Sequence, residues 1–316
     1  MSGTKLTNEI QIIGGAKTGY NLYKFLEKEG IVSTLYYFPN EYSKKKKIGE
    51  AFNVEQKQLY ISENILVSSE TAFNNLSKLQ LPNLSCHYFL RDKANIPEIA
   101  IGIETNYIPE LQVNNLSFPL AVKPRESMGD KVPFKFKKIK SKKEFDDLGA
   151  IVDDCLLQPY LDDKNYQQIA VAGYFNGHMN SLIAVEQKNH YPKGISAYVL
   201  DKTSENIKLI HRIETYLSTS EYKGFIEFEF KQNLDTKEYF LMDINPRTWG
   251  WFYYYLDSIQ NFKEVFLENK AVKLKVKKAW VNTPRLGMAI LKERNLSSPK
   301  ICDVLKNKIC YEPYFK

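Results

Sequence analysis

The sequence predicts an α/β protein built from three consecutive parts. Its first part contains IQIIGGAKTGYNLYKFLEKEGIVSTLYYF, in which a short apolar strand, a glycine turn, a helix with apolar residues at helical spacing and a second strand follow one another. This β-α-β order implies parallel strands. Further along the chain, two segments with period-two alternation predict a hairpin. At 316 residues the chain exceeds the usual size of one domain, and we place the parts at residues 1–108, 109–160 and 161–316.

The predicted hairpin, GFIEFEFKQNLDTKEYFLMDINPRTWGW at residues 224–251, alternates carboxylates with bulky apolar residues. A hairpin symmetric about residue 236 places Glu229 opposite Asp243, and Glu227 opposite Asn245. Like charges that face each other destabilise a sheet, so we expect a cation between the two carboxylates. Strict alternation gives one face to Ile226, Phe228, Phe230, Phe240, Met242 and Ile244, and the other to Phe225, Glu227, Glu229, Lys231, Leu241, Asp243 and Asn245.

The middle part contains a lysine beside a glycine-containing loop. Residues 118–122 predict a buried strand that ends at Lys123 and is stopped by Pro124. The segment ESMGD at 126–130 is a small, flexible loop centred on Gly129. This combination suits a phosphate, because the ammonium group neutralises charge and the loop amides add donors.

The same patterns predict the remaining elements. Helices are expected around 70–80, 92–103 and 205–222, and in KKEFDDLGAIV after the glycine loop. The segment IAVAGYFNGHMNSLIAVEQKNH predicts two strands around a turn at Asn176–Gly177. Beyond Tyr254 we predict only helix and loop.

Composition argues against several classes of protein. A hydrophobic fraction of 43% is ordinary for a globular chain, no apolar run is long enough for a bilayer, and MSGTKLTNEIQ is too polar for a signal peptide. The four cysteines show no paired spacing, which favours reduced thiols and a cytoplasmic location. With four histidines in all, a histidine-rich metal site is not expected.

The formal charge of +7 is concentrated in two lysine runs, KKKK at 44–47 and KFKKIKSKK at 135–143. Solvated surface is the simpler interpretation of these runs, and attraction for phosphates or an acidic substrate is the alternative. They match no nucleic-acid-binding motif, so we predict no nucleic-acid partner. The segment GGAKTG lacks the G-x-G-x-x-G spacing, and no acidic residue ends the next strand at Tyr37–Phe38, which argues against NAD.

Taken in order, these segments resemble the ATP-grasp superfamily. The order is a strand with a lysine, a flexible glycine loop, a helix, an LLQPYL hinge, a strand pair and GFIEFEFK…FLMDINPR. The chain is most similar to carboxylate–amine ligase-like (carbamoyl-phosphate-synthase-like) members, whose last motif is roughly Glu-x-Asn-Pro-Arg-x-Trp-Gly. The segment RDKANIPEIAIGIETNYIPE resembles the family's approach to the nucleotide-binding lobes, and IQIIGGAKTGYN resembles its preceding domain. The resemblance covers nearly the whole chain.

This resemblance implies an ATP-grasp fold with an N-terminal pre-ATP-grasp β-α-β domain. That domain and the helix leading out of it would occupy residues 1–108. The nucleotide-binding lobes are α+β in the family. A small lobe with the flexible glycine loop would span 109–160, and a large lobe with the metal hairpin would span 161–316.

The resemblance also implies that Glu229, Asp243 and Asn245 bind Mg²⁺, with Mn²⁺ as an alternative. Mg²⁺ prefers one or two carboxylates together with phosphate oxygens and water, and these side chains supply two carboxylates and an amide oxygen. The family usually has Glu where Asp243 stands, so one or two bound ions remain open. Glu227 points the same way and is expected to support the ligands. The simpler interpretation is a polar, solvent-exposed face of an edge hairpin.

Two residues are assigned to catalysis by the resemblance. Arg247 is placed to stabilise the transferring γ-phosphoryl group and the resulting acyl-phosphate, since a guanidinium binds phosphate bidentately. Lys188 and the loop at 191–194 lie where family members often contact the substrate or the phosphates. A surface salt bridge for Arg247 and a solvated Lys188 are the simpler interpretations. Trp249 and Trp251 are assigned to packing.

For the nucleotide, the resemblance assigns the phosphates to Lys93 and Lys123, although a surface lysine is an alternative for Lys93. The hinge residues Gln158, Tyr160 and Leu161 would meet the adenine edge. Asp163 is assigned to the ribose hydroxyls, with Asp162 and Asn165 as alternatives because the loop after the hinge is one residue shorter than the family pattern.

The resemblance implies an ATP-dependent ligase that activates a carboxylate as an acyl-phosphate and joins it to an amine. A small-molecule carboxylate and an amine would be its substrates, whereas no membrane partner is expected and a homo-oligomer is left open. Two alternatives remain at this point, an ATP-grasp phosphotransferase acting on a small molecule and a non-catalytic nucleotide-binding module. No segment resembles a fused glutaminase or a biotin carrier.

Overall fold

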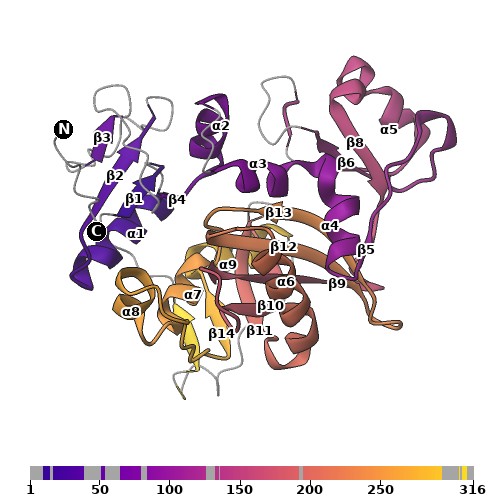
Figure 1. Cartoon of the computed structure of the whole chain (residues 1–316). Coiled ribbons are helices and arrows are strands. Elements are labelled where there is room, and N and C mark those ends of the chain that lie inside the picture. Colours follow the sequence, from indigo (N-terminus) through magenta and orange to yellow (C-terminus); the bar gives the residue numbers. More distant parts are fainter. Residues whose placement is uncertain are drawn as a thin grey trace.

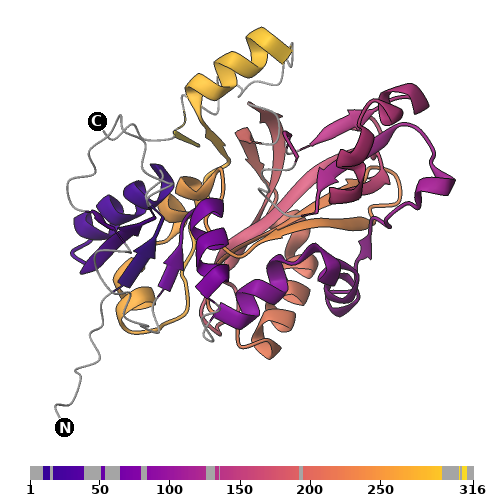
Figure 2. The ribbon, with the colours of Figure 1, turned by 90° about the horizontal axis from the view of Figure 1, so that it is seen from above.

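The computed structural model describes residues 10–14, 17–38, 51–53, 65–79, 84–125, 132–134, 136–191, 195–293, 306 and 308–311. Within these residues the chain forms sheets of four, eight and three strands (Figure 1). The four-stranded and three-stranded sheets lie at opposite ends of the eight-stranded sheet, as the view from above shows (Figure 2). The α/β class predicted from the sequence is confirmed.

The four-stranded sheet is parallel and has the order β3-β2-β1-β4. Helix α1 joins β1 to β2, which confirms the predicted β-α-β start. The turn after β1 requires glycine, because Gly14 has a φ of +133° and a Cβ there would lie 2.3 Å from Ser68 Oγ. The elements are β1 (Ile10–Ile13), α1 (Lys17–Lys28), β2 (Ser33–Tyr37), β3 (Ala51–Asn53), β4 (Ile65–Val67) and α2 (Glu70–Leu79).

The eight-stranded sheet has the order β15-β14-β11-β10-β9-β12-β13-β5. The β9–β10 and β12–β13 hairpins confirm both strand pairs predicted from the sequence. The prediction of only helix and loop beyond Tyr254 was wrong, because β14 and β15 add two strands of three residues, too short to show alternation. The strands are β5 (Asn106–Tyr107), β9 (Tyr166–Phe175), β10 (Leu182–His190), β11 (Ser196–Asp201), β12 (Gly224–Asn233), β13 (Tyr239–Asn245), β14 (Ala279–Val281) and β15 (Ile309–Tyr311).

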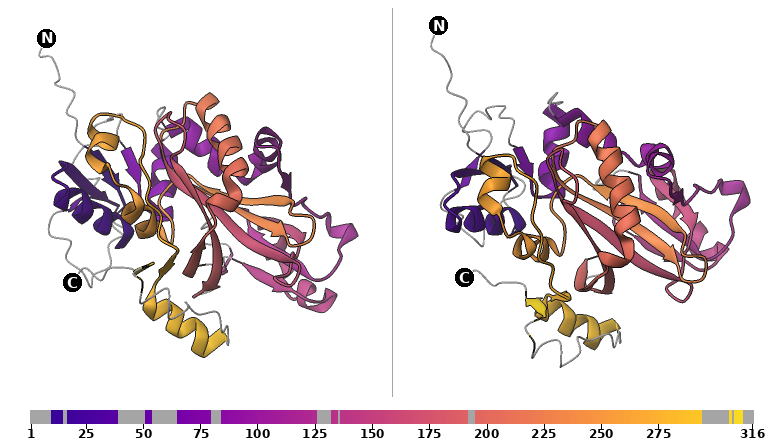
Figure 3. Two further views of the ribbon diagram at one scale, coloured as in Figure 1. Left: turned by 90° about the horizontal axis from the view of Figure 1, so that it is seen from below. Right: turned by 60° about the horizontal axis from the view of Figure 1, so that its bottom comes forward.

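Helices cover one face of the eight-stranded sheet. Ile99 of α4 and Ile213 of α6 pack in one core with Ile226, Phe228 and Phe230 of β12. Helix α9 lies against β10 and β11 at one end of the sheet (Figure 3). The helices are α3 (Ser85–Arg91), α4 (Ile96–Gly102), α6 (Ile207–Thr219), α7 (Phe252–Ser258), α8 (Phe262–Leu267) and α9 (Thr283–Glu293), and a short 3-10 turn spans Lys93–Asn95.

The three-stranded sheet is antiparallel and has a core of its own with helix α5 (Lys142–Asp146). Its strands are β6 (Leu120–Pro124), β7 (Lys137–Ile139) and β8 (Cys155–Pro159), with β6 in the centre. The predicted strand at 118–122 is displaced by two residues, so that Lys123 lies inside β6. Pro124 is the last residue of β6, a position where a missing N–H is tolerated.

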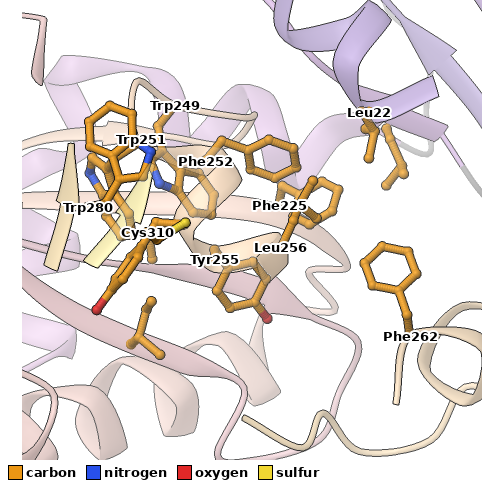
Figure 4. Packing of buried hydrophobic residues seen from close by; sticks show 14 of the residues in the cluster. Leu22, Phe225, Trp249, Trp251, Phe252, Tyr255, Leu256, Phe262, Trp280 and Cys310 are labelled. Atoms are coloured by element: carbon orange, nitrogen blue, oxygen red, sulfur yellow. The ribbon is translucent and has the colours of Figure 1, made fainter. Parts of the chain in front are cut away.

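A continuous apolar core joins the N-terminal sheet to the other face of the large sheet. Leu22 of α1, Phe262 of α8 and Phe225 of β12 belong to one cluster with Trp249 and Trp251 (Figure 4). The rings of Phe225 and Phe252 contact edge to face, with centroids 4.7 Å apart. These two sheets therefore form one packed unit, whereas the three-stranded sheet is packed separately.

The hairpin contains an irregularity that strict alternation did not predict. Glu229 pairs with Asp243, but the next residue, Phe230, pairs with Leu241, so one extra residue bulges from β13. Leu241 therefore turns into the helix-covered core beside Phe228 and Ile244. The assignment of Leu241 to the carboxylate face was wrong for this reason.

No helix in the described ranges is long and apolar enough to cross a membrane.

A buried histidine on α3 makes stability depend on pH. Burial lowers the pKa of His87 to about 4, and its Nδ1 has no partner among the described residues. An unfolded histidine titrates near about 6.5, so the unfolded state binds a proton that the folded state lacks below that pH. We expect His87 to make unfolding easier by about 1 kcal/mol per pH unit as the pH falls from 6.5 towards 5.

Denaturant titrations of wild type and His87→Phe between pH 7 and 5 would test this expectation. In His87→Phe the free energy of unfolding should depend less on pH, because the contribution of His87 is removed. His211→Phe, at an exposed position on α6, should show the same pH dependence as wild type. Equal slopes for wild type and His87→Phe would show that His87 titrates normally in the folded protein.

Candidate functional site

The β12–β13 hairpin places two carboxylates opposite each other. Glu229 faces Asp243 and Glu227 faces Asn245, which confirms the predicted register. Burial raises the pKa of Glu229 to about 7, and the charge of Asp243 acts in the same direction. A partly buried pair of carboxylates is costly unless positive charge lies near it.

Lys123 of β6 supplies such a charge from the three-stranded sheet. Burial lowers the pKa of Lys123, whereas the charges of Asp243 and Glu229 oppose that shift. The small sheet and the hairpin are therefore coupled electrostatically at this point. The cation expected from the sequence is provided in part by the chain itself.

Two further ammonium groups join this cluster. The charges of Lys93 and Lys231 both act on Lys123 and lower its pKa further. Lys93 Nζ donates to the backbone carbonyl of Pro124 at 2.9 Å, which holds it beside the end of β6. Lys123 thus lies near the Glu229–Asp243 pair and near two further ammonium groups, an arrangement that favours an anionic ligand.

Arg247 is the guanidinium of the cluster and is bound from three directions. Its Nε donates to Glu70 Oε2 at 2.7 Å, its Nη1 to the Thr248 carbonyl at 2.7 Å and its Nη2 to Asn245 Oδ1 at 2.9 Å. Burial opposes the charge of Arg247, but Glu70 raises its pKa. The surface salt bridge considered from the sequence is thus replaced by a largely buried one.

Glu227 orients the amide of Asn245. Asn245 Nδ2 donates to Glu227 Oε2 at 3.1 Å, and Trp251 Nε1 donates to Glu227 Oε1 at 3.0 Å. The amide oxygen of Asn245 consequently faces the other way, towards Arg247. Burial and the neighbouring Glu229 raise the pKa of Glu227 well above its ordinary value. Trp251 packs in the core as expected and also binds this carboxyl group.

The hinge predicted from the sequence connects β8 to β9. The buried Gln158 donates from Nε2 to the Ile108 carbonyl at 2.8 Å, and no described residue partners its Oε1. Lys138 Nζ lies 3.7 Å from the centre of the Tyr160 ring. Leu161 follows at a half-buried position. The hinge segment thus contains a buried acceptor, Gln158 Oε1, that no described residue donates to, and, further along, the aromatic ring of Tyr160.

Asp163 and Asp162 differ in what they bind. Asp163 has an exposed side chain, and its Oδ1 lies 2.5 Å from Lys231 Nζ. Asp162 Oδ1 accepts the backbone amides of Lys164 and Asn165 at 3.0 and 3.1 Å, which fixes the turn before β9. Asp163 is therefore the carboxylate of this loop that faces the lysine cluster.

Comparison with known proteins gives structural matches only. No family model matches the chain, and no curated protein matches its sequence. An N5-carboxyaminoimidazole ribonucleotide synthetase in complex with ADP is similar to this chain with a TM-score of 0.65 and 17% identity, over 91% of this chain and 85% of that one.

Two further solved structures cover most of the chain. The L-amino acid ligase from Bacillus licheniformis has a TM-score of 0.59 and 16% identity, over 84% of this chain and 74% of that one. The biotin carboxylase from Campylobacter jejuni, solved with an ATP ligand, has a TM-score of 0.58 and 11% identity, over 86% and 74%. All three structures are ATP-grasp folds.

The chain has the ATP-grasp fold.

In this ATP-grasp fold the donor set of the hairpin suits Mg²⁺. Two carboxylates, Glu229 and Asp243, lie opposite each other beside an amide oxygen that Glu227 has oriented. Hard divalent cations take such oxygen donors, and the raised pKa of Glu229 reflects a site that gains from added positive charge. The described residues contain no cluster of three or more His, Cys, Asp and Glu side chains with metal-binding geometry. The fit therefore depends on Asn245 as the third donor.

Lys188 is the predicted site residue on β10, and its role at the site stays a prediction. Its Nζ forms a salt bridge with Glu186. Glu186 pairs with Ile169, which belongs to the helix-covered core, so this contact lies on the opposite face of the sheet from Glu229. The alternation of β10 breaks at a bulge around Lys188, which is why its face could not be inferred from the sequence.

The sequence analysis missed three charged residues of this region. Glu70 and Arg91 come from α2 and α3, and nothing in their local patterns connects them to a hairpin more than 130 residues away. Lys231 carried a usable signal, because it shares the face of Glu229 on β12. The glycine loop at 126–131 and positions 192–194 lie outside the described residues.

Proposed function

We propose that the chain is a Mg²⁺-dependent ligase that uses ATP to activate a carboxylate as an acyl-phosphate and joins it to an amine. One observation carries this proposal. The charges of Glu229 and Asp243 act on Lys123, and the charge of Asp243 also acts on Arg247, so these four groups lie close together. The ATP-grasp fold supports it, because the similar structures include an amino acid ligase, a synthetase with ADP and a biotin carboxylase with an ATP ligand.

In this proposal the phosphates of ATP lie against Lys93 and Lys123, whose ammonium groups neutralise their charge. The hinge at Gln158, Tyr160 and Leu161 receives the adenine. The Oε1 of Gln158 supports this assignment, because it has no partner among the described residues and a buried acceptor gains from an amino-group donor. Asp163 takes the ribose hydroxyls, and Lys231 holds its carboxylate in place.

Glu229, Asp243 and Asn245 would hold Mg²⁺, or Mn²⁺ in its place. Bound there, the ion would neutralise charge on the phosphate oxygens. Glu227 holds the amide nitrogen of Asn245 away from the ion, and the ion would share the Asn245 oxygen with Arg247 Nη2, which donates to it at 2.9 Å. Arg247 stabilises the negative charge that spreads over the transferring phosphoryl group, since its guanidinium is fixed before the reaction and needs no reorganisation. Lys188, which forms a salt bridge with Glu186, stays a proposed contact for the substrate or the phosphates.

The substrates proposed are a small carboxylic acid and an amine, in a cytoplasmic enzyme without nucleic-acid or membrane partners. The test is ADP release in the presence of Mg²⁺ and pooled carboxylates and amines, with products identified by mass spectrometry. A ligase releases ADP rapidly only when both an acid and an amine are present. Release with a single acceptor would point to a phosphotransferase, and failure to bind Mg·ATP would overturn the proposal.

Lys123→Ala should weaken the binding of Mg·ATP. Lys123 is mostly buried beside the carboxylates, and the loss of a charge-assisted contact of this kind costs about 1.5–3 kcal/mol, roughly ten- to a hundredfold in affinity. Isothermal titration calorimetry measures this directly. Lys142→Ala removes an exposed lysine of α5 that pairs with Asp146 and serves as the control. Wild-type affinity in Lys123→Ala would exclude this lysine from the nucleotide site.

A further inference from the structure

A single carboxylate connects the N-terminal sheet to Arg247. Glu70 is the first residue of α2, separated from β4 by Ser68 and Ser69, and its side chain is 16% exposed. Its Oε2 accepts from Arg247 Nε at 2.7 Å. Its other oxygen, Oε1, accepts from Arg91 Nε at 3.2 Å and Nη2 at 2.6 Å. Each oxygen of Glu70 therefore serves a different arginine.

The backbone next to Arg247 is attached to the same strand end. The Thr248 amide donates to the Val67 carbonyl at 3.2 Å, and Thr248 Oγ1 donates to the Ser68 carbonyl at 2.9 Å. The DINPRTW segment, residues 243–249, is thus bound through both its backbone and the Arg247 guanidinium. Its partners are Val67, Ser68 and Glu70, which lie where β4 leads into α2. The N-terminal sheet consequently fixes where the segment lies and how Arg247 is turned.

The contacts define the plane of the guanidinium. A guanidinium is rigid and planar, so hydrogen bonds in three directions, to Glu70, Asn245 and Thr248, leave it one orientation. Glu70 is the charged member of the three. Without its charge, Arg91 and Arg247 would be two partly buried cations with no shared counter-ion, and Arg247 would be free to turn away.

We propose that Glu70 is a positioning residue, through which the N-terminal part of the chain orients Arg247 towards the transferring phosphoryl group. The proposal rests on the function proposed above for Arg247. Glu70 itself touches neither ATP nor metal in this arrangement. Arg91 holds the second oxygen of Glu70 and so prevents the carboxylate from rotating. Burial works against the charge of Glu70, but Arg247 and Arg91 together lower its pKa, which keeps it ionised at neutral pH.

The contact can be measured without any ligand by ¹⁵N–¹H NMR of arginine Nε groups. Arg247→Lys identifies the Arg247 signal by its disappearance. In wild type this Nε–H should exchange slowly with water, and in Glu70→Gln its exchange should accelerate by at least about tenfold, the scale of one charge-assisted hydrogen bond. Asp257→Asn, which removes a carboxylate from Lys277 elsewhere, is the matched control and should leave the signal unchanged.

The kinetic arm uses ADP release with the acid and amine found by screening. Glu70→Gln should lower kcat by at least about tenfold with little change in the KM for ATP, because a mispositioned Arg247 affects the transition state more than nucleotide binding. The double variant Glu70→Gln/Arg247→Lys should be no slower than Arg247→Lys within about twofold, since two residues acting through one contact are not additive. Arg91→Lys keeps a cation at Glu70 but cannot donate from two fixed nitrogens, so it should lower kcat by less than Glu70→Gln does.

If Glu70→Gln does not fold, Glu70→Asp replaces it. Asp keeps the charge but is too short to reach both arginines, and the same changes are expected in smaller degree. Unchanged Nε–H exchange of Arg247 in a folded Glu70 variant would overturn the proposal, as would additive losses in the double variant. A wild-type protein that binds no Mg·ATP would instead overturn the proposed function, and the NMR result alone would then decide whether Glu70 positions Arg247.

Discussion

Asp243→Asn is expected to lower turnover at least about a hundredfold, the scale seen when one electrostatic stabiliser of a transition state is removed. The substitution keeps the size and hydrogen bonding of the side chain but deletes the charge that faces Glu229. The metal-free protein should be as stable as wild type to within about 1 kcal/mol. Relief of repulsion with Glu229 is offset by the loss of attraction to Lys123.

The same variant should lose most of its stabilisation by Mg·ATP. A ligand at a hundred times its Kd stabilises a protein by about 2.7 kcal/mol, which thermal unfolding with and without Mg·ATP would reveal in wild type. Asp235→Asn makes the same chemical change in the exposed turn of the same hairpin and should behave like wild type. If Asp243→Asn showed normal turnover and a normal Mg·ATP-induced shift in melting temperature, the hairpin would be a polar face that binds no metal.

Arg247→Lys is expected to bind Mg·ATP within about threefold of wild type and to lose at least about a hundredfold in kcat. An ammonium group keeps the charge but cannot reach Glu70, Asn245 and Thr248 together, so its position is no longer fixed. Calorimetry would give the affinity and steady-state ADP release the rate.

Arg212→Lys provides the control for this change. Arg212 lies on α6, where its Nη1 donates to the Glu104 carbonyl at 2.6 Å on the helix-covered side of the sheet. It should alter neither ATP affinity nor rate. A loss of affinity in Arg247→Lys with an unchanged kcat would mean that Arg247 binds the ground state as strongly as the transition state.

The hairpin shows which structural features a sequence can predict. Alternation and a turn centred on residue 236 gave the pairs Glu229–Asp243 and Glu227–Asn245, because period two and the turn together determine register. The bulge beside Glu229 was not predicted, because a single unpaired residue does not change the alternating pattern of the sequence. Leu241 was therefore placed on the wrong face.

Contacts between distant segments could not be predicted from the sequence for a different reason. Glu70 and Arg247 are 177 residues apart, and nothing in a lone Glu at the start of a helix specifies its partner. The direction of the Lys188 side chain could not be predicted for a local reason, because β10 has a bulge at this residue. Lys93 and Lys123 were placed together by the resemblance, and the structure puts their charges within reach of each other.

The shared core of the N-terminal and large sheets limits how the chain can be shortened. Phe225, Phe252 and Phe262 belong to one core with Leu22 and Leu26 of α1, and Figure 4 shows Leu22 on the side of Phe262 and Phe225. A truncated chain starting at α3 would expose these rings as a contiguous apolar surface of the kind that drives aggregation. It would also lack Glu70, so loss of solubility and loss of the Arg247 contact would come together. The N-terminal sheet therefore completes the apolar core of the large lobe, and we do not expect the large lobe to fold stably without it.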